Sequence, residues 1–251
     1  MKLDSSNKRI LVISDIHQES DKASEIIKKE DADEVVILGD FFDSFQKNSE
    51  SDTEKTCNFL LECFQTEKMF VLWGNHDLHY FRPSRHTICS GYSSIRQTSI
   101  NELLYPIKNY LSKKFKWYIQ IDDFICTHAG ISPFHIRPNL DLEKTYEWLD
   151  EEAKTATIKL ETNDSHWFYG AGKARRGKLE KGGIVWLDFN YEFEPINGLK
   201  QIMGHTFEKI IRPDYSEKSS NPNDWRNICI DCNLNQYLII DNKKIKVVDF
   251  V

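Results

Sequence analysis

The stretch that decides the fold is RILVISDIH, residues 9–17, in which a short apolar run leads directly into Asp15 and His17. The run ILVI consists of four aliphatic residues, three of them β-branched, and favours a strand that is buried on both faces. Side chains that follow such a strand lie at its carboxyl end, where α/β proteins place their functional sites. The sequence therefore predicts a buried strand that delivers an aspartate and a histidine to a site.

The same order, an apolar run followed by polar side chains, recurs at four further places. These runs are residues 34–38 (EVVIL), 69–73 (MFVLW), 124–127 (FICT) and 199–203 (LKQIM). Between the early runs, apolar residues recur at helical spacing over 20–30 and 53–67, which predicts two amphipathic helices. Strand and helix thus alternate at the start of the chain, and this predicts parallel strands joined by right-handed crossovers.

The middle of the chain is predicted to be helical and its end to be rich in strands. One helix is expected over 99–111, interrupted by Pro106, and a longer helix over 142–160. Three closing strands are expected at 227–232, 237–240 and 245–250. Because the sequence contains no internal repeat or long linker, we expect one α/β domain over residues 1–251, with a helical insertion or cap at roughly 90–160.

The composition excludes several classes of protein. The 251 residues include 33 Lys and Arg against 39 Asp and Glu, a formal net charge of −6, and 40% of them are hydrophobic. This apolar content excludes intrinsic disorder, and every apolar run is far shorter than the ~18 residues of a membrane span. The acidic balance disfavours nucleic acid as a partner.

The six cysteines lie at scattered positions, and only Cys229 and Cys232 form a CxxC pair. The two-residue period of a strand would place these two side chains on opposite faces, so we interpret them as structural. We expect buried, reduced cysteines of an intracellular protein. Residues 1–8 are polar and lack the apolar core of a signal peptide, so we predict a cytoplasmic location.

Metal-capable side chains follow all five apolar runs. Because the carboxyl ends of the strands meet at one edge of a sheet, we expect these side chains to lie together. The expected set is Asp15, His17, Asp40, Asn75, His128 and His205. Carboxylates and imidazoles this close need a cation among them, because like charges cannot all remain ionised. A mixed oxygen and imidazole set suits Mn, Fe or Zn, whereas Mg and Ca prefer oxygen ligands alone.

Six protein ligands are too many for one catalytic ion that keeps an open position, and they suit two ions that share a bridging carboxylate. Two ions ~3.5–4 Å apart can clamp a phosphate, generate a bridging hydroxide and stabilise both in-line oxygens. Gly39, Gly74 and Gly204 fit this arrangement, because glycine permits tight turns where the backbone approaches a site. The residues thus predict a dinuclear metal centre.

These residues together resemble the calcineurin-like metallophosphoesterase superfamily. Five motifs carry the resemblance, in order from residue 15 to residue 205: Asp15-x-His17, Gly39-Asp40-x-x-Asp43, Gly74-Asn75-His76-Asp77, His128 and Gly204-His205. The stretch THAGISP, residues 127–133, is most similar to the phosphoprotein phosphatase branch, which includes symmetrical dinucleoside tetraphosphatases. The resemblance implies an α/β fold with a central β-sandwich flanked by helices.

The resemblance also implies which residues hold metal ions. Asp15, His17 and Asp40 would hold the first ion. Asp40 would bridge to a second ion, whose other ligands would be Asn75, His128 and His205. We expect two divalent transition-metal ions, Mn²⁺ in the first place, with Fe or Zn as alternatives.

His76 and Asp43 are implied as the catalytic pair. His76 would protonate the leaving-group oxygen, and Asp43 would orient its imidazole. The assignment is also chemically sound from the residues themselves, because a histidine paired with a carboxylate holds a proton near neutral pH.

One motif departs from the family pattern. Phosphatases of the family usually have Arg-Gly after the second aspartate of GDxxD, and the arginine clamps the phosphate, but here Ser44-Phe45 stands in that place. Another cation must therefore neutralise the phosphate, or phosphate binding is weaker and depends more on the metal ions. The candidates are Arg82, Arg85, Arg175 and Arg176.

The residues and the resemblance together predict a dinuclear metal-dependent phosphatase that hydrolyses phosphate esters by direct attack of the metal-bridging hydroxide. We expect a phosphomonoesterase of the phosphoprotein phosphatase type, acting on a phosphoprotein, a small phosphomonoester or a nucleotide. A hydrolase of dinucleoside polyphosphates is the alternative within the same chemistry, and a non-catalytic interaction scaffold is the alternative from a different class. The histidines without motif support are expected on the surface or in loops: His79, His86, His135 and His166.

Overall fold

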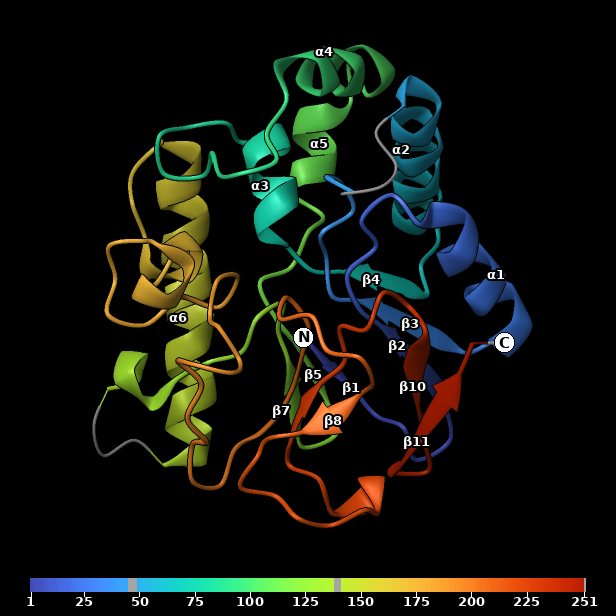
Figure 1. Ribbon diagram of the computed structural model, residues 1–251, viewed down its shortest axis with the longest axis vertical. Helices are drawn as coiled ribbons and strands as arrows, with labels where there is room; N and C mark the ends of the chain where they lie inside the picture. The colour runs from blue at the N-terminus through green and yellow to red at the C-terminus, as the bar shows by residue number, and fades with distance from the viewer. Residues whose placement is uncertain (45–48, 138–140, 251) are drawn as a thin grey trace.

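Two β-sheets form the centre of the molecule in the computed structural model, which describes residues 1–44, 49–137 and 141–250 (Figure 1). The five-stranded sheet has the order β11-β10-β2-β3-β4, and the six-stranded sheet has the order β1-β5-β6-β7-β9-β8. The strands are β1 (Lys2–Leu3), β2 (Arg9–Ile13), β3 (Glu34–Ile37), β4 (Met69–Val71), β5 (Ile119–Ile121), β6 (Phe124–Cys126), β7 (Lys200–Met203), β8 (Arg212–Pro213), β9 (Asn227–Cys229), β10 (Gln236–Asp241) and β11 (Lys244–Asp249).

Helices cover both sides of the pair of sheets. The α-helices are α1 (Ser20–Glu30), α2 (Glu50–Gln65), α3 (Asn75–Phe81), α4 (Ser94–Leu103), α5 (Lys108–Ser112) and α6 (Leu142–Glu161). Short 3-10 helices are η1 (Pro133–His135), η2 (Trp167–Tyr169), η3 (Lys173–Arg175) and η4 (Pro222–Asp224). Figure 1 shows α1 and α2 on one side of the molecule and α6 on the other.

The start of the chain has the predicted parallel arrangement. β2 and β3 pair in parallel, and so do β3 and β4, with α1 and α2 as the two crossovers. The carboxyl ends of these three strands therefore meet at one edge of the five-stranded sheet. β10 and β11 complete this sheet in the antiparallel sense.

The residues of β2 alternate between two apolar cores, which explains why its run is apolar throughout. Ile10 and Val12 belong to a cluster that also contains Ile202 of the six-stranded sheet, so this core lies between the sheets. Leu11 and Ile13 belong to the larger cluster, to which the helices contribute. Both faces of the strand are thus buried. The predicted β-sandwich with flanking helices is confirmed.

The helices expected over 90–160 do not form one continuous segment. Helices α4 and α5 come first, with Pro106 between them, and β5 and β6 of the six-stranded sheet then follow before α6 begins. Strands β1, β5 and β8, each of two or three residues, were not predicted. Helix α2 begins three residues earlier than predicted, because Ser49 Oγ accepts a hydrogen bond from Asp52 N at 3.1 Å and caps it.

Cys229 and Cys232 lie as their spacing predicted, in different apolar clusters on opposite faces of their segment. All six cysteines are unpaired thiols, five of them are buried, and Cys89 is half-buried. No helix in the described part of the chain is long and apolar enough to cross a membrane. The cytoplasmic location stays a prediction.

Candidate active site

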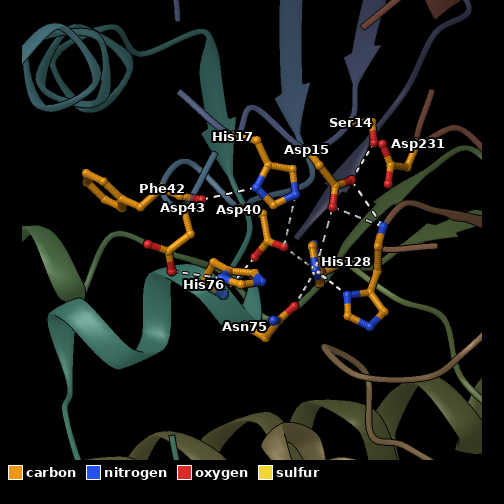
Figure 2. Close-up of polar contacts among 12 residues, drawn as sticks. Ser14, Asp15, His17, Asp40, Phe42, Asp43, Asn75, His76, His128 and Asp231 are labelled. Carbon is orange, nitrogen blue, oxygen red and sulfur yellow. Dashed lines mark hydrogen bonds and ion pairs between the residues drawn. The ribbon is translucent and has the colours of Figure 1, made fainter. Parts of the chain in front are cut away.

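The predicted site residues meet at the carboxyl ends of strands from both sheets. Asp15 and His17 follow β2, Asp40 follows β3, His128 follows β6 and His205 follows β7. Asn75 and His76 are the first two residues of α3, which begins shortly after β4. Figure 2 shows the labelled side chains converging from these loops. Five of the residues line a cavity of about 1670 Å³: His17, Asp40, Asn75, His76 and His205.

Asp15, His17 and Asp40 form one group of three with metal-ligating atoms within 4.8 Å of one another. His17 Nδ1 lies 3.1 Å from the carbonyl oxygen of Phe42, which can only accept, so Nδ1 carries the proton of the neutral ring. His17 Nε2 then holds the lone pair, and it lies 3.8 Å from Asp40 Oδ2. This is the usual arrangement of a metal-binding histidine, whose second nitrogen is anchored by an acceptor.

Asp40, His128 and His205 form a second such group, which shares Asp40 with the first. His128 Nδ1 lies 2.9 Å from the carbonyl oxygen of Leu38, so the lone pair of this ring is also at Nε2. His128 Nε2 lies 3.3 Å from Asp40 Oδ2, 3.2 Å from His205 Nδ1 and 3.1 Å from Asn75 Oδ1. Asn75 thus adds its amide oxygen to the second group.

The donor atoms around His128 Nε2 fit a bound cation. A carboxylate oxygen of Asp40, the amide oxygen of Asn75 and an imidazole nitrogen of His205 all lie within hydrogen-bonding distance of His128 Nε2, and the carboxylates favour a positive charge among these atoms. Electron pairs this close repel unless a positive charge lies between them. In addition, His205 Nε2 is buried and has no hydrogen-bond partner among the described residues. The residues present therefore fit a metal ion in each of the two groups.

The backbone around the site is strained in a way that aims these side chains. His17, Asp40, Asp43 and His205 have φ angles of 42°, 50°, 66° and 65°, in the left-handed region that costs a non-glycine residue of order 1 kcal/mol or more. Such conformations cluster at functional sites, where the surrounding structure holds them. Of these four residues, His17, Asp40 and His205 line the cavity, whereas Asp43 contacts His76.

Two glycines allow the loops to approach the carboxylates. A Cβ atom on Gly74 would lie 2.1 Å from Asp40 Oδ1, and one on Gly204 would lie 2.2 Å from Asp15 Oδ2. Contacts this short are forbidden, so only glycine fits at either position. The predicted reason for these glycines is confirmed.

The charges of the two groups act strongly on one another. Burial opposes the charge on His128, but Asp40 and Asp15 outweigh it and raise the pKa of His128 to about 10. Burial also opposes the charge on Asp40, whose pKa is nevertheless held well below its ordinary value by His128 and His76. Burial and the neighbouring His128 lower the pKa of His205, which keeps that ring neutral and able to bind a metal.

His76 and Asp43 form the predicted pair beside the metal-ligating groups. His76 Nδ1 lies 2.8 Å from Asp43 Oδ2, and the backbone N–H of His76 donates to Asp40 Oδ1 at 2.8 Å. Asp43 also accepts from Tyr80 Oη at 2.5 Å and from Arg96 Nη1. Although burial opposes its charge, hydrogen bonds with His76 and His79 lower the pKa of Asp43 to about 2. An ionised Asp43 therefore fixes the orientation of the His76 ring.

His79 is not on the surface, and the expectation for it was wrong. Its side chain is completely buried, its Nε2 lies 2.6 Å from Asp43 Oδ2, and its Nδ1 lies 3.2 Å from Cys89 Sγ. His166 is also nearly buried, with its Nε2 3.3 Å from Glu152 Oε2. The signal for His79 was its spacing of three residues from His76, which places both rings on one face of α3.

Three of the four predicted phosphate-binding arginines line the cavity, namely Arg85, Arg175 and Arg176. Arg175 is anchored, because its Nε lies 2.8 Å from Asp188 Oδ2 and its Nη2 lies 3.2 Å from Thr206 Oγ1. Arg82 does not line this cavity, because its guanidinium donates to Ser112 Oγ at 2.8 Å, and the structure corrects the prediction for that residue. Ser44 lines the cavity where the family arginine is missing, and Phe45 lies outside the described residues.

Two buried aspartates were not assigned a role from the sequence. The carboxylate of Asp77 accepts from the backbone nitrogens of Asp40 and Phe41, both at 2.8 Å, and of Gly74 at 3.1 Å, so it ties the two central loops together. Asp231 lies beside Asp15 and His17, and burial together with the charge of Asp15 raises its pKa to about 8. Asp231 follows β9, so the rule that located the other site residues also points to it.

Comparisons with known proteins agree with this geometry. A family model of the calcineurin-like phosphoesterases matches residues 8–209. Similar solved structures include a cold-active protein-tyrosine phosphatase of a psychrophilic Shewanella species, with 16% identity, a TM-score of 0.62, and 98% of this chain and 78% of that chain covered. A protein serine/threonine phosphatase from Saccharomyces cerevisiae has 15% identity and a TM-score of 0.54, with 100% of this chain and 84% of that chain covered.

A protein assigned as a diadenosine tetraphosphatase is also similar, with 14% identity, a TM-score of 0.51, and 100% of this chain and 98% of that chain covered. At these identities the structures establish a shared fold and not a shared substrate. No curated protein sequence matches the chain. The family model spans most of the chain and all six metal-capable residues, and the chain therefore belongs to the calcineurin-like phosphoesterase family.

Proposed function

We propose that this protein is a dinuclear metal-dependent phosphatase, most closely a phosphomonoesterase of the phosphoprotein phosphatase type. Membership of the family makes it a hydrolase that acts on phosphate esters. The observation that supports the dinuclear centre is that two groups of metal-ligating side chains share Asp40 and face one cavity. We expect Mn²⁺ in both positions, with Fe or Zn as alternatives, because the ligands mix oxygen and imidazole.

The six ligand residues divide between two ions as the geometry groups them. One ion would be held by Asp15, His17 and Asp40. The other would be held by Asp40, His128 and His205, with the amide oxygen of Asn75 beside them. When bound, two such ions supply charge neutralisation for phosphoryl oxygens and a water-derived nucleophile at neutral pH.

His76 is positioned to transfer a proton. Because its Nδ1 contacts Asp43, its Nε2 is the atom that can donate to the leaving-group oxygen of a bound ester. Tyr80 and Arg96 hold Asp43 from the opposite side, so the carboxylate cannot rotate away from His76. Proton donation of this kind contributes ~10²- to 10⁴-fold to a rate.

Arg175 is the best-placed cation to replace the missing motif arginine. Its contact with Thr206 Oγ1 puts it next to His205, and its ion pair with Asp188 fixes it at the cavity wall. Arg85 and Arg176 line the same cavity and are more exposed than Arg175. Arg175 therefore contacts the phosphate, and the other two serve a longer substrate.

A dinucleoside polyphosphate hydrolase is the second candidate, and the size of the cavity favours it. A volume of about 1670 Å³ exceeds what a phosphoryl group with a small ester requires. Arg85, Arg176 and Lys178 line it along with Trp186, which supplies cations for a polyphosphate and an aromatic surface for a base. The same features also accommodate a phosphorylated peptide.

Turnover of three substrates by the Mn²⁺-loaded protein tests these proposals. Phosphatase activity on p-nitrophenyl phosphate and a phosphopeptide, with little on diadenosine tetraphosphate, supports the phosphomonoesterase. A kcat/KM for diadenosine tetraphosphate that exceeds both others by tenfold or more supports the second candidate. If the protein binds no metal and hydrolyses none of the three substrates, the result would support the non-catalytic scaffold instead. Asp40→Asn is the inactive control in each assay.

A further inference from the structure

A third group of potential metal ligands lies behind His76, outside the proposed dinuclear centre. His76, His79 and Cys89 each place one ligand atom within 4.8 Å of the others. The proposed function uses only His76 of these three residues. His79 and Cys89 have no role in it, yet both lie in direct contact with residues of the site.

The geometry of the group matches a small tetrahedral ion. His79 Nδ1 lies 3.2 Å from Cys89 Sγ, close to the ~3.5 Å that separates a nitrogen and a sulfur bound to one tetrahedral Zn²⁺ at ordinary bond lengths. His76 and His79 are three residues apart on α3, and their ring centroids are 5.5 Å apart. The backbone of α3 thus fixes the two imidazoles on one face.

Asp43 supplies the carboxylate partner that metal-binding histidines normally have. Its Oδ2 lies 2.6 Å from His79 Nε2 and 2.8 Å from His76 Nδ1. A carboxylate on the far nitrogen fixes the tautomer and raises the basicity of a metal-binding histidine. For His79, this contact at Nε2 directs the lone pair of Nδ1 toward Cys89.

The thiolate distinguishes this ligand set from that of the dinuclear centre. Two imidazoles and a thiolate suit Zn²⁺, whereas the oxygen and imidazole ligands of the dinuclear centre include no sulfur. The ion can also reach the group, because His76 and Cys89 both line the large cavity. Three protein ligands leave a fourth position for water, as in zinc sites that exchange their ligands.

From this geometry we propose that His76, His79 and Cys89 form a separate inhibitory site for a thiophilic divalent cation such as Zn²⁺. Binding releases the Cys89 thiol proton to solvent and leaves a thiolate bound to the ion. His76 then acts as a metal ligand and cannot donate a proton: coordination at Nε2 occupies the donor atom, and coordination at Nδ1 displaces Asp43. The inhibition rests on the proposed function, whereas the binding does not.

Co²⁺ added to the Mn²⁺-loaded protein tests the binding, because a thiolate bound to Co²⁺ gives a near-ultraviolet charge-transfer band that oxygen and imidazole ligands do not. We expect this band in the natural protein, its loss in Cys89→Ser, and at least tenfold weaker Co²⁺ binding in His79→Gln. Cys57→Ala, in helix α2, is the matched cysteine control and should keep the band. Absence of the band from the natural protein, or its persistence in Cys89→Ser, would overturn the site.

Zn²⁺ inhibition of the Mn²⁺-loaded protein tests the consequence. Each variant is compared with its own rate without Zn²⁺, and circular dichroism confirms that it is folded. We expect half-inhibition of Cys89→Ser and His79→Gln to require at least tenfold more Zn²⁺ than half-inhibition of the natural protein or of Cys57→Ala. Equal sensitivity of all four proteins would refute the inhibition. The cobalt band reports on the site even if no phosphate ester is hydrolysed, so the two proposals can fail separately.

Discussion

Replacing His76 by asparagine is the perturbation that tests the proposed proton transfer. Loss of a general acid costs ~10²- to 10⁴-fold in rate, which corresponds to about 3–5 kcal/mol at 1.36 kcal/mol per tenfold change. The fold should survive, because Asp43 keeps its contacts with His79, Tyr80 and Arg96 when His76 is removed. One lost charge-assisted hydrogen bond costs about 1.5–3 kcal/mol of stability. The ligands of the dinuclear centre are untouched, so the Mn²⁺ content should not change.

A series of aryl phosphates separates this role from a general loss of activity. A p-nitrophenolate leaves without help from an acid, whereas a phenolate needs a proton, so the His76→Asn defect should grow from p-nitrophenyl phosphate to phenyl phosphate. The control is His135→Asn, since His135 stacks on Trp167 and does not line the cavity. An equal defect on every leaving group, or a loss of metal from His76→Asn, would refute the assignment.

Three further outcomes follow from buried groups of the site. Asp77→Ala leaves three backbone N–H groups without their acceptor, so urea denaturation should show that the free energy of unfolding falls by ~3 kcal/mol or more. A smaller decrease would mean that Asp77 does not tie the loops together. Arg175→Ala should lower kcat/KM by ~10- to 100-fold if the guanidinium contacts phosphate, and an unchanged value would contradict that contact. The pKa of Asp231 is raised to about 8, so between about pH 4 and 8 the folded state of the metal-free protein holds a proton that the unfolded state has lost. The free energy of unfolding should therefore fall by up to ~1.4 kcal/mol per pH unit as the pH rises through this range. Asp231→Asn should reduce that slope in denaturation curves, and an unchanged slope would show that another group is responsible.

The strand-end pattern predicted which side chains the structure brings together, and its physical basis explains why. A strand buried on both faces must be apolar throughout, as β2 is, so the first few polar residues after it mark the point where the chain reaches the site. Asp15, Asp40 and His128 were located in this way. The same pattern identified the glycines. Their loops approach a carboxylate so closely that a Cβ atom would lie about 2 Å from its oxygen, which leaves no room for a side chain.

The sequence pattern was less informative where a role depends on tertiary contacts. His79 had no signal beyond its spacing from His76, and its burial against Asp43 and Cys89 emerges only from the fold. Arg82 and Arg175 looked alike as cations near motifs, yet one donates to Ser112 and the other lines the cavity. Long flexible side chains can reach many partners, so their targets cannot be deduced from sequence position.

The metal content of the purified protein after saturation with Mn²⁺ and removal of the excess tests the central claim most directly. Because Asp40 belongs to both ligand groups, we predict two ions per chain in the natural protein and loss of both from Asp40→Asn, while His76→Asn retains two. Asp40→Asn that still binds two ions, or a natural protein that binds none, would contradict a dinuclear centre built around this carboxylate.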